Sequence, residues 1–138
     1  MPRKDQIHDA VKNALVKAGW TITNDPFRIH YEDLDVYADL RVEKVEGTNG
    51  ARQALVIEIK SFLDDSAIHS LEVALGQYMT YRTFLNEVAP EHALYLAIGD
   101  TIYRSQFQRK SFQLIVRENQ VGVIVVDVLQ EEIVAWIN

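Results

Sequence analysis

Asp39 and the triplet Glu58-Ile59-Lys60 are the residues of this sequence best suited to chemistry. On a β-strand, Glu58 and Lys60 share one face because side chains alternate with a period of two. Charges are costly in the otherwise interior-type run from Leu55 to Ile59 unless they are paired or bound to a cation. Mg²⁺ (or Mn²⁺) takes a few carboxylate oxygens together with water and a substrate phosphate. The residues therefore predict a site that holds a divalent cation against a phosphodiester, with Lys60 acting on the attacking water or on the phosphate charge.

An ion pair offers a simpler interpretation of the same residues. Lys60 could pair with Glu58 or Asp39 on a solvated sheet face and perform no chemistry. Two further residues, Gln77 and Tyr81, lie in the helix expected after the lysine, and their spacing of four puts them on one helical face. Taken alone, they are typical of a polar helix edge with a packed aromatic ring.

A β-hairpin is expected to carry the charged residues. Apolar and polar side chains alternate over residues 35–45, which predicts one continuous strand with Asp39 on its polar face. The sequence Gly-Thr-Asn-Gly at 47–50 favours a tight reversal, so residues 52–60 should pair antiparallel with that strand. This pairing brings Asp39 alongside Glu58, unless the register sends it to the opposite face.

Helices and further strands surround the hairpin in the predicted fold. Apolar residues at helical spacing and Gly19 after them predict a helix over residues 4–18. A long helix is expected from about 64 to 86, with its buried stripe at Ile68, Leu71, Leu75 and Met79. The remaining expected elements are strands at 20–23, 27–30, 94–98 and 121–128, a helical region at 101–118 broken near Gln108, and a strand or short helix at 131–137. Together they predict a single α/β domain over residues 1–138, a mixed β-sheet flanked by helices.

Composition narrows the class of protein. The 138-residue chain is 48% hydrophobic and 25% charged, as soluble globular proteins are. It has no cysteine, no apolar run of the roughly 20 residues that span a bilayer, and no apolar signal sequence in its first five residues. We therefore expect a cytoplasmic protein without membrane association.

The net charge of −6 opposes avid, sequence-blind binding to nucleic acid. A local basic patch still allows binding, because the positions of the charges matter as well as their sum. The most basic stretch runs from residue 104 to residue 117. Its residues Arg104, Arg109 and Lys110 are candidate DNA-binding residues, with a solvated helix face as the alternative.

The layout of elements and motifs resembles the restriction-endonuclease-like PD-(D/E)xK nucleases. The resemblance rests on Asp39, Glu58-Ile59-Lys60 and Gln77-x-x-x-Tyr81, the last being similar to the helix motif of the RecB-type branch. It implies that Asp39 and Glu58 bind the metal, that Lys60 is the catalytic lysine, that Gln77 assists at the site and that Tyr81 contacts the substrate. By analogy it also implies a homodimer, and it leaves open whether Asp9 on the first helix joins the site.

A second resemblance covers nearly the whole chain. The segments 8–12, 19–23, 56–62 and 74–78 look like those of the XisH family, the fdxN element excision controlling factors. This resemblance implies a part in the programmed excision of a cyanobacterial DNA element, alongside an XisI-type companion protein and a site-specific recombinase.

Two functions remain as hypotheses. The first is a Mg²⁺-dependent DNA nuclease, or a nuclease-derived DNA-processing factor, that acts in excision. The second is a catalytically silent regulatory module that recruits the companion protein or the recombinase. The acidic net charge and the lack of an extended basic face favour the second, since a nuclease fold can be kept for binding alone.

Overall fold

Helix α1 (Lys4–Lys17) begins the part of the chain that the computed structural model describes, residues 4–138. Residues 1–3, which entered the expectation about a signal sequence, lie outside the described residues. The helix buries Ile7, Val11 and Leu15 on one face, as their spacing predicts. Gly19 follows with a φ of +95°, the left-handed conformation that ends many helices and that glycine adopts without strain.

A six-stranded mixed sheet forms the centre of the fold, in the order β1-β4-β5-β6-β7-β8. Its strands are β1 (Thr21–Asn24), β4 (Leu40–Glu46), β5 (Ala51–Ile59), β6 (Ala93–Gly99), β7 (Gly122–Asp127) and β8 (Glu132–Ile137). The predicted hairpin is confirmed, because β4 and β5 pair antiparallel from Leu40 opposite Ile57 to Glu46 opposite Ala51. Strands β5, β6 and β7 run parallel, since helical crossovers join them, and β8 returns antiparallel to β7.

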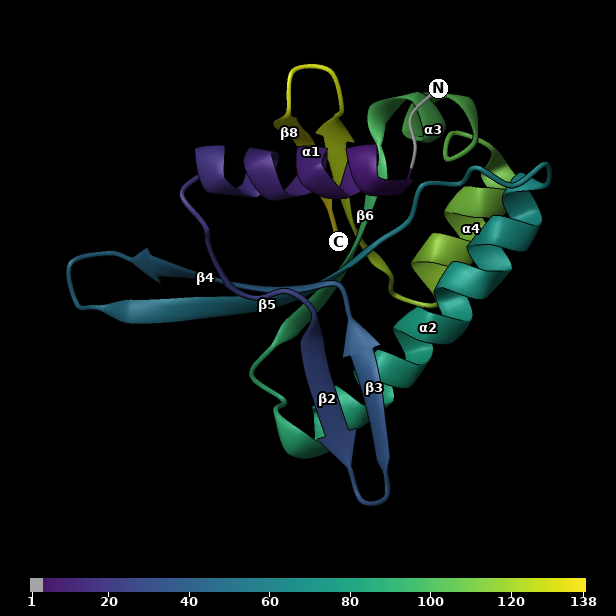
Figure 1. The fold of residues 1–138 in the computed structure, drawn as a ribbon. Helices are drawn as coiled ribbons and strands as arrows, with labels where there is room; N and C mark the ends of the chain where they lie inside the picture. Colours follow the sequence, from purple (N-terminus) through teal and green to yellow (C-terminus); the bar gives the residue numbers. More distant parts are fainter. Residues whose placement is uncertain (1–3) are drawn as a thin grey trace.

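Helices cover both faces of the sheet. Helix α1 packs on one face, while α2 (Ala67–Val88) and α4 (Lys110–Glu118) pack on the other (Figure 1). A short helix, α3 (Asp100–Ser105), follows β6 and is separate from α4, which confirms the predicted break near Gln108. Helix α2 starts after Ser66, whose side-chain oxygen accepts a hydrogen bond from the His69 N–H at 3.2 Å. Among the described residues, no helix combines the length and the apolar character needed to cross a membrane.

The strand expected over residues 35–45 is wrong in one respect, because it breaks at Asp39. The residues before the break form β3 (Leu34–Ala38), which pairs with β2 (Phe27–Tyr31) in a separate two-stranded ribbon. Ala38 packs into the core beneath α2, whereas Leu40 packs into the core beneath α1. The alternation of side chains could not reveal this break, since a chain that changes sheets can keep its period of two.

The buried face of α2 also differs from the predicted stripe. Leu71 is buried as expected, but Ile68 and Met79 are 42% and 38% exposed. Tyr78 and Tyr81 are buried instead, and each hydroxyl donates a hydrogen bond to a backbone carbonyl. A buried tyrosine is stable when its hydroxyl has such a partner. The helix therefore packs through aromatic rings with polar tips, which a search for purely apolar positions passes over.

The β2–β3 ribbon lies alongside α2, as Figure 1 shows. The rings of Tyr31 on β2 and Phe84 on α2 are 5.5 Å apart. Val36 on β3 packs against the same core as α2. The ribbon is thus attached to the sheet through Asp39 and to the helix through its own side chains.

Candidate metal and phosphodiester site

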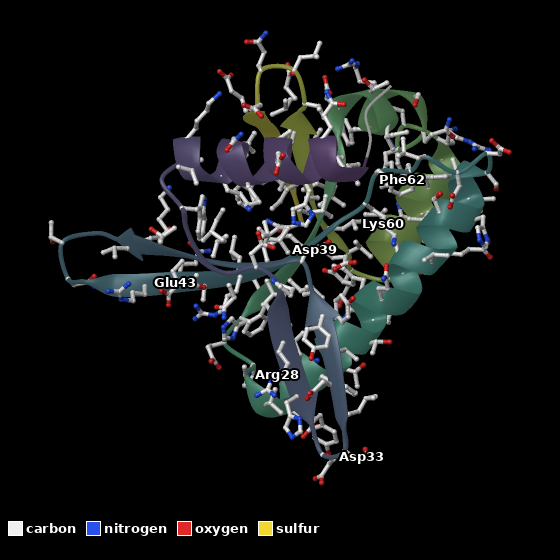
Figure 2. All side chains as sticks on the ribbon, in the orientation of Figure 1. Arg28, Asp33, Asp39, Glu43, Lys60 and Phe62 are labelled. Atoms are coloured by element: carbon white, nitrogen blue, oxygen red, sulfur yellow. The ribbon has the colours of Figure 1, made fainter. Side chains whose placement is uncertain are left out.

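Asp39 lies where the β2–β3 ribbon meets the main sheet, with Lys60 beyond it in the direction of α2 (Figure 2). Strand β4 begins at Leu40, which lies opposite Ile57, so the N–H of Ile59 lies beyond the start of β4. The Asp39 carboxylate acts there in place of a strand carbonyl, because its Oδ2 accepts a hydrogen bond from the Ile59 N–H at 2.7 Å. One oxygen of Asp39 therefore holds the end of β5.

Glu58 is almost completely buried, with 5% of its surface exposed. Because Leu40 faces Ile57 in the hairpin, Asp39 comes opposite Glu58. Burial, followed by the negative charge of Asp39, raises the pKa of Glu58 from 4.5 to about 8, while the charge of Lys60 acts in the opposite direction. A second carboxylate held out of water beside the first is unfavourable until a cation offsets the charge.

Lys60 follows directly on β5. Its backbone N–H donates to the carbonyl of Ala97 at 3.0 Å, which continues the pairing of β5 with β6 and fixes the residue. No carboxylate of the described residues lies within 4.0 Å of its ammonium group. Within the described residues, Lys60 therefore forms no ion pair with Glu58 or Asp39, which was the simpler interpretation of these residues.

Helix α2 supplies Gln77 and Tyr81 from one face, as their spacing predicts. The Tyr81 hydroxyl donates a hydrogen bond to the backbone carbonyl of Tyr37 at 2.8 Å. Burial, together with the charges of Glu58 and Asp39, raises the pKa of Tyr81, so the hydroxyl stays a neutral donor. The predicted substrate contact of Tyr81 stays a prediction, but in the structure its hydroxyl is committed to holding β3.

All five predicted site residues, Asp39, Glu58, Lys60, Gln77 and Tyr81, line one cavity of about 360 Å³. Two buried oxygens of these residues, Glu58 Oε1 and Gln77 Oε1, have no hydrogen-bond donor among the described residues. Such acceptors are rare, because each costs about 1–3 kcal/mol when it is left without a partner. A hard cation takes oxygen ligands of this kind, so the residues present fit Mg²⁺ or Mn²⁺.

The protein contributes few metal ligands. Asp39 and Glu58 are the two predicted ligands; a third carboxylate on the cavity wall, Asp64, accepts a hydrogen bond from Ser70, and residues 4–138 contain no group of three or more His, Asp or Glu side chains placed to hold a metal. Mg²⁺ commonly keeps several water ligands and binds through one or two carboxylates plus substrate phosphates. A two-carboxylate site therefore suits an ion that is completed by its substrate.

The structure does not bring the predicted basic residues to this cavity. Arg104 forms an ion pair within α3, where its Nη1 lies 2.8 Å from Asp100 Oδ2. Arg109 precedes α4 and lies over the ring of Phe112, and Lys110 is exposed at the first turn of that helix. None of the three basic residues lines the cavity of Asp39 and its partners.

Sequence reasoning missed several residues of the cavity wall, among them Asp64 in the loop before α2. From α1 the wall includes Ile7 and His8, whereas Asp9 is exposed and does not line it. From the start of α2 it includes the buried Ser70, whose hydroxyl donates to Asp64 Oδ2 at 3.2 Å. Neither position belongs to a spaced motif, so only the packing of α1 and α2 on the same sheet end reveals them.

Known proteins resemble the whole of this chain. The model of the XisH protein family matches residues 1–134. The crystal structure of an XisH family protein from Nostoc punctiforme PCC 73102 is 40% identical, with a TM-score of 0.88 over 97% of this chain and 100% of that chain. The structure of an fdxN element excision controlling factor protein from Anabaena variabilis is 41% identical, with a TM-score of 0.88 over 98% of this chain and 100% of that chain. No curated protein matches.

Proposed function

The chain belongs to the XisH family, and we propose that it controls the excision of a DNA element through phosphodiester chemistry at the Asp39–Glu58–Lys60 cavity. The role in excision follows from the family and from the relative described as an fdxN element excision controlling factor. The chemistry is supported by one observation above all. Glu58 Oε1 and Gln77 Oε1 are buried oxygens that find no donor within residues 4–138, and they line one cavity with Asp39, which is an environment that a divalent cation would complete.

Each residue has a role that its surroundings support. Asp39 and Glu58 would hold Mg²⁺ or Mn²⁺, which when bound polarises the phosphodiester and offsets its charge. Lys60 lies on the same cavity wall and its ammonium group has no carboxylate partner in the described part of the chain, so it can meet the attacking water or the developing charge on the phosphate. Gln77 offers its amide to the same space, and Tyr81 fixes the ribbon that carries Asp39.

DNA is the substrate we propose, in the setting of an XisI-type companion protein and a site-specific recombinase. The decisive assay incubates the purified protein with linear, branched and gapped DNA in Mg²⁺ or Mn²⁺, with and without the companion protein. Glu58→Ala and Lys60→Ala should each lose at least about 100-fold in cleavage rate. Glu72→Gln is the matched control, because Glu72 is an exposed carboxylate on α2. Cleavage that persists unchanged in both site variants contradicts the assignment of this site.

A catalytically silent recruiting module is the second candidate. It is favoured by the −6 net charge and by the basic residues of α3 and α4, which lie outside the cavity. Under this alternative, folded Lys60→Ala protein supports excision in cells as well as the unmodified protein does. Loss of excision with a folded Lys60→Ala variant contradicts the alternative and supports the first proposal.

A further inference from the structure

His8 is a titratable side chain in the cavity that the proposed chemistry does not yet use. It lies on α1, across the sheet end from α2, and lines the same cavity as Asp39, Glu58 and Lys60. Its side chain is 25% exposed, which makes it neither a core residue nor a free surface residue. A histidine that lines one concave site together with three carboxylates (Asp39, Glu58 and Asp64) and a lysine is a candidate acid or base.

A carboxylate stands behind the imidazole. Asp25 Oδ1 lies 3.6 Å from His8 Nε2, close enough for charge pairing although longer than a hydrogen bond. The other oxygen of Asp25 lies 2.7 Å from Lys12 Nζ. The hydrogen bond from Lys12 lowers the pKa of Asp25, so this carboxylate stays negative. The turn between β1 and β2 is thereby held against α1 by Asp25, with one oxygen directed at each of two α1 side chains.

The two nitrogens of His8 are in different situations. Nε2 is the atom near Asp25, while Nδ1 has no hydrogen-bond partner among the described residues. Because Asp25 lies at one ring nitrogen, the other nitrogen is the one left to exchange a proton with a substrate. Lys12 prevents Asp25 from turning away, because it occupies the second oxygen.

We propose that His8, oriented by Asp25, is the general acid that protonates the leaving oxygen when a phosphodiester is cleaved in this cavity. This inference rests on the proposed nuclease function. Water forms the new P–O bond and releases its proton to solvent, while the bond from phosphorus to the leaving oxygen breaks. The imidazolium gives its proton to that oxygen, so an alcohol departs, and the neutral imidazole regains a proton from solvent. In this role His8 is a catalytic residue and Asp25 is a positioning residue.

A bridging phosphorothiolate tests the proton transfer directly. A thiolate leaves without protonation, so DNA that carries sulfur in place of the leaving oxygen bypasses a general acid. His8→Gln should cleave ordinary DNA about 10²–10⁴-fold more slowly, yet cleave the 3′- or 5′-phosphorothiolate within a few-fold of the unmodified protein. Asp25→Asn should show a smaller defect that the same substrate rescues. His69→Gln is the matched control, since His69 is exposed on α2 and lies outside the cavity.

Two measurements without turnover accompany the assay. The shift in melting temperature that Mg²⁺ causes and the affinity for DNA in Ca²⁺ should be the same in His8→Gln as in the unmodified protein, because His8 is not placed among the metal ligands. The inference is overturned if His8→Gln is slowed equally on ordinary and phosphorothiolate DNA, if it is slowed on neither, or if it loses affinity for DNA. If the glutamine variant is unstable, His8→Asn repeats the test. Absence of cleavage by the unmodified protein on every substrate instead overturns the nuclease function itself, and this inference with it.

Discussion

The hydroxyl of Tyr81 and the backbone carbonyl of Tyr37 form a 2.8 Å hydrogen bond between residues 44 positions apart in the chain. It joins the middle of α2 to β3 two residues before Asp39, which then turns back to accept the N–H of Ile59. Helix, ribbon and central sheet are therefore connected at the point where the two carboxylates meet. The position of Asp39 depends on α2 as well as on its own hairpin.

Tyr81→Phe should weaken both the fold and the site. Removing the hydroxyl leaves the carbonyl of Tyr37 without its donor, which costs about 1–2 kcal/mol in the free energy of unfolding by urea. Because the ribbon is then less firmly held beside Asp39, the affinity for Mg²⁺ should also fall. Tyr78→Phe is the control, since its hydroxyl joins Leu94 and Gly122 away from the carboxylates. An equal loss of metal affinity in both variants contradicts a special role for Tyr81.

The stability of the metal-free protein should fall as the pH rises from about 4.5 to about 8. The folded state raises the pKa of Glu58 through burial and the charge of Asp39, so folded protein binds more protons than unfolded protein in this window. The stabilising contribution is full below the unfolded pKa and is lost as the pH rises through the folded one. Urea titrations in EDTA at several pH values measure this slope.

Glu58→Gln removes that titration. At pH 8 in EDTA, the variant should be more stable than the unmodified protein, by on the order of 2–4 kcal/mol for a pKa raised by this much. At pH 4.5 the two proteins should unfold at similar urea concentrations. A difference in the free energy of unfolding that is the same at both pH values contradicts the buried-carboxylate explanation.

Mg²⁺ alone should raise the melting temperature, because an ion that binds only the folded state stabilises it by mass action. The gain is about 2.7 kcal/mol at a free concentration of 100 times the dissociation constant. Glu58→Gln should abolish the shift, EDTA should reverse it, and Glu72→Gln should retain it. An identical shift in Glu58→Gln places the ion elsewhere on the protein.

The basic stretch can be tested apart from the cavity. If α4 contacts DNA, Lys110→Ala lowers the affinity for all sequences alike and reduces the slope of log affinity against log salt by about one. Cleavage at saturating DNA should not change, since Lys110 does not line the cavity. Lys17→Ala removes a charge from α1 and serves as the control. An unchanged salt slope in Lys110→Ala identifies the stretch as an ordinary solvated helix face.

The sequence was sufficient for the hairpin and for the placement of its charged residues in one cavity. The Gly-Thr-Asn-Gly turn and the alternation in the two strands predict an antiparallel hairpin that can bring Asp39 alongside Glu58, and the structure has that pairing of strands. Such local signals work because turn residues and a period of two leave few alternatives. The spacing of four between Gln77 and Tyr81 likewise predicts that they share one helical face, and both line the cavity.

The sequence was insufficient where packing between distant segments decides the structure. The break at Asp39 depends on whether the chain pairs with β2 or with β5, and both pairings satisfy the same alternation. His8 reaches the cavity only because α1 crosses the sheet near the end of β5, which no local pattern encodes. The buried face of α2 was mispredicted because backbone carbonyls of other elements satisfy its tyrosines.

The two carboxylates would be under unequal constraint if a lineage lost the chemistry. Asp39 would still be needed, because its Oδ2 holds the N–H of Ile59 at the end of β5 whether or not a cation is bound. Glu58 would be free to change, and its replacement would even make the fold more stable, since a buried carboxyl beside Asp39 is a burden without a ligand. Among relatives, an aspartate at position 39 is thus explained by the fold alone, whereas a glutamate retained at position 58 despite its cost in stability indicates that the site still functions.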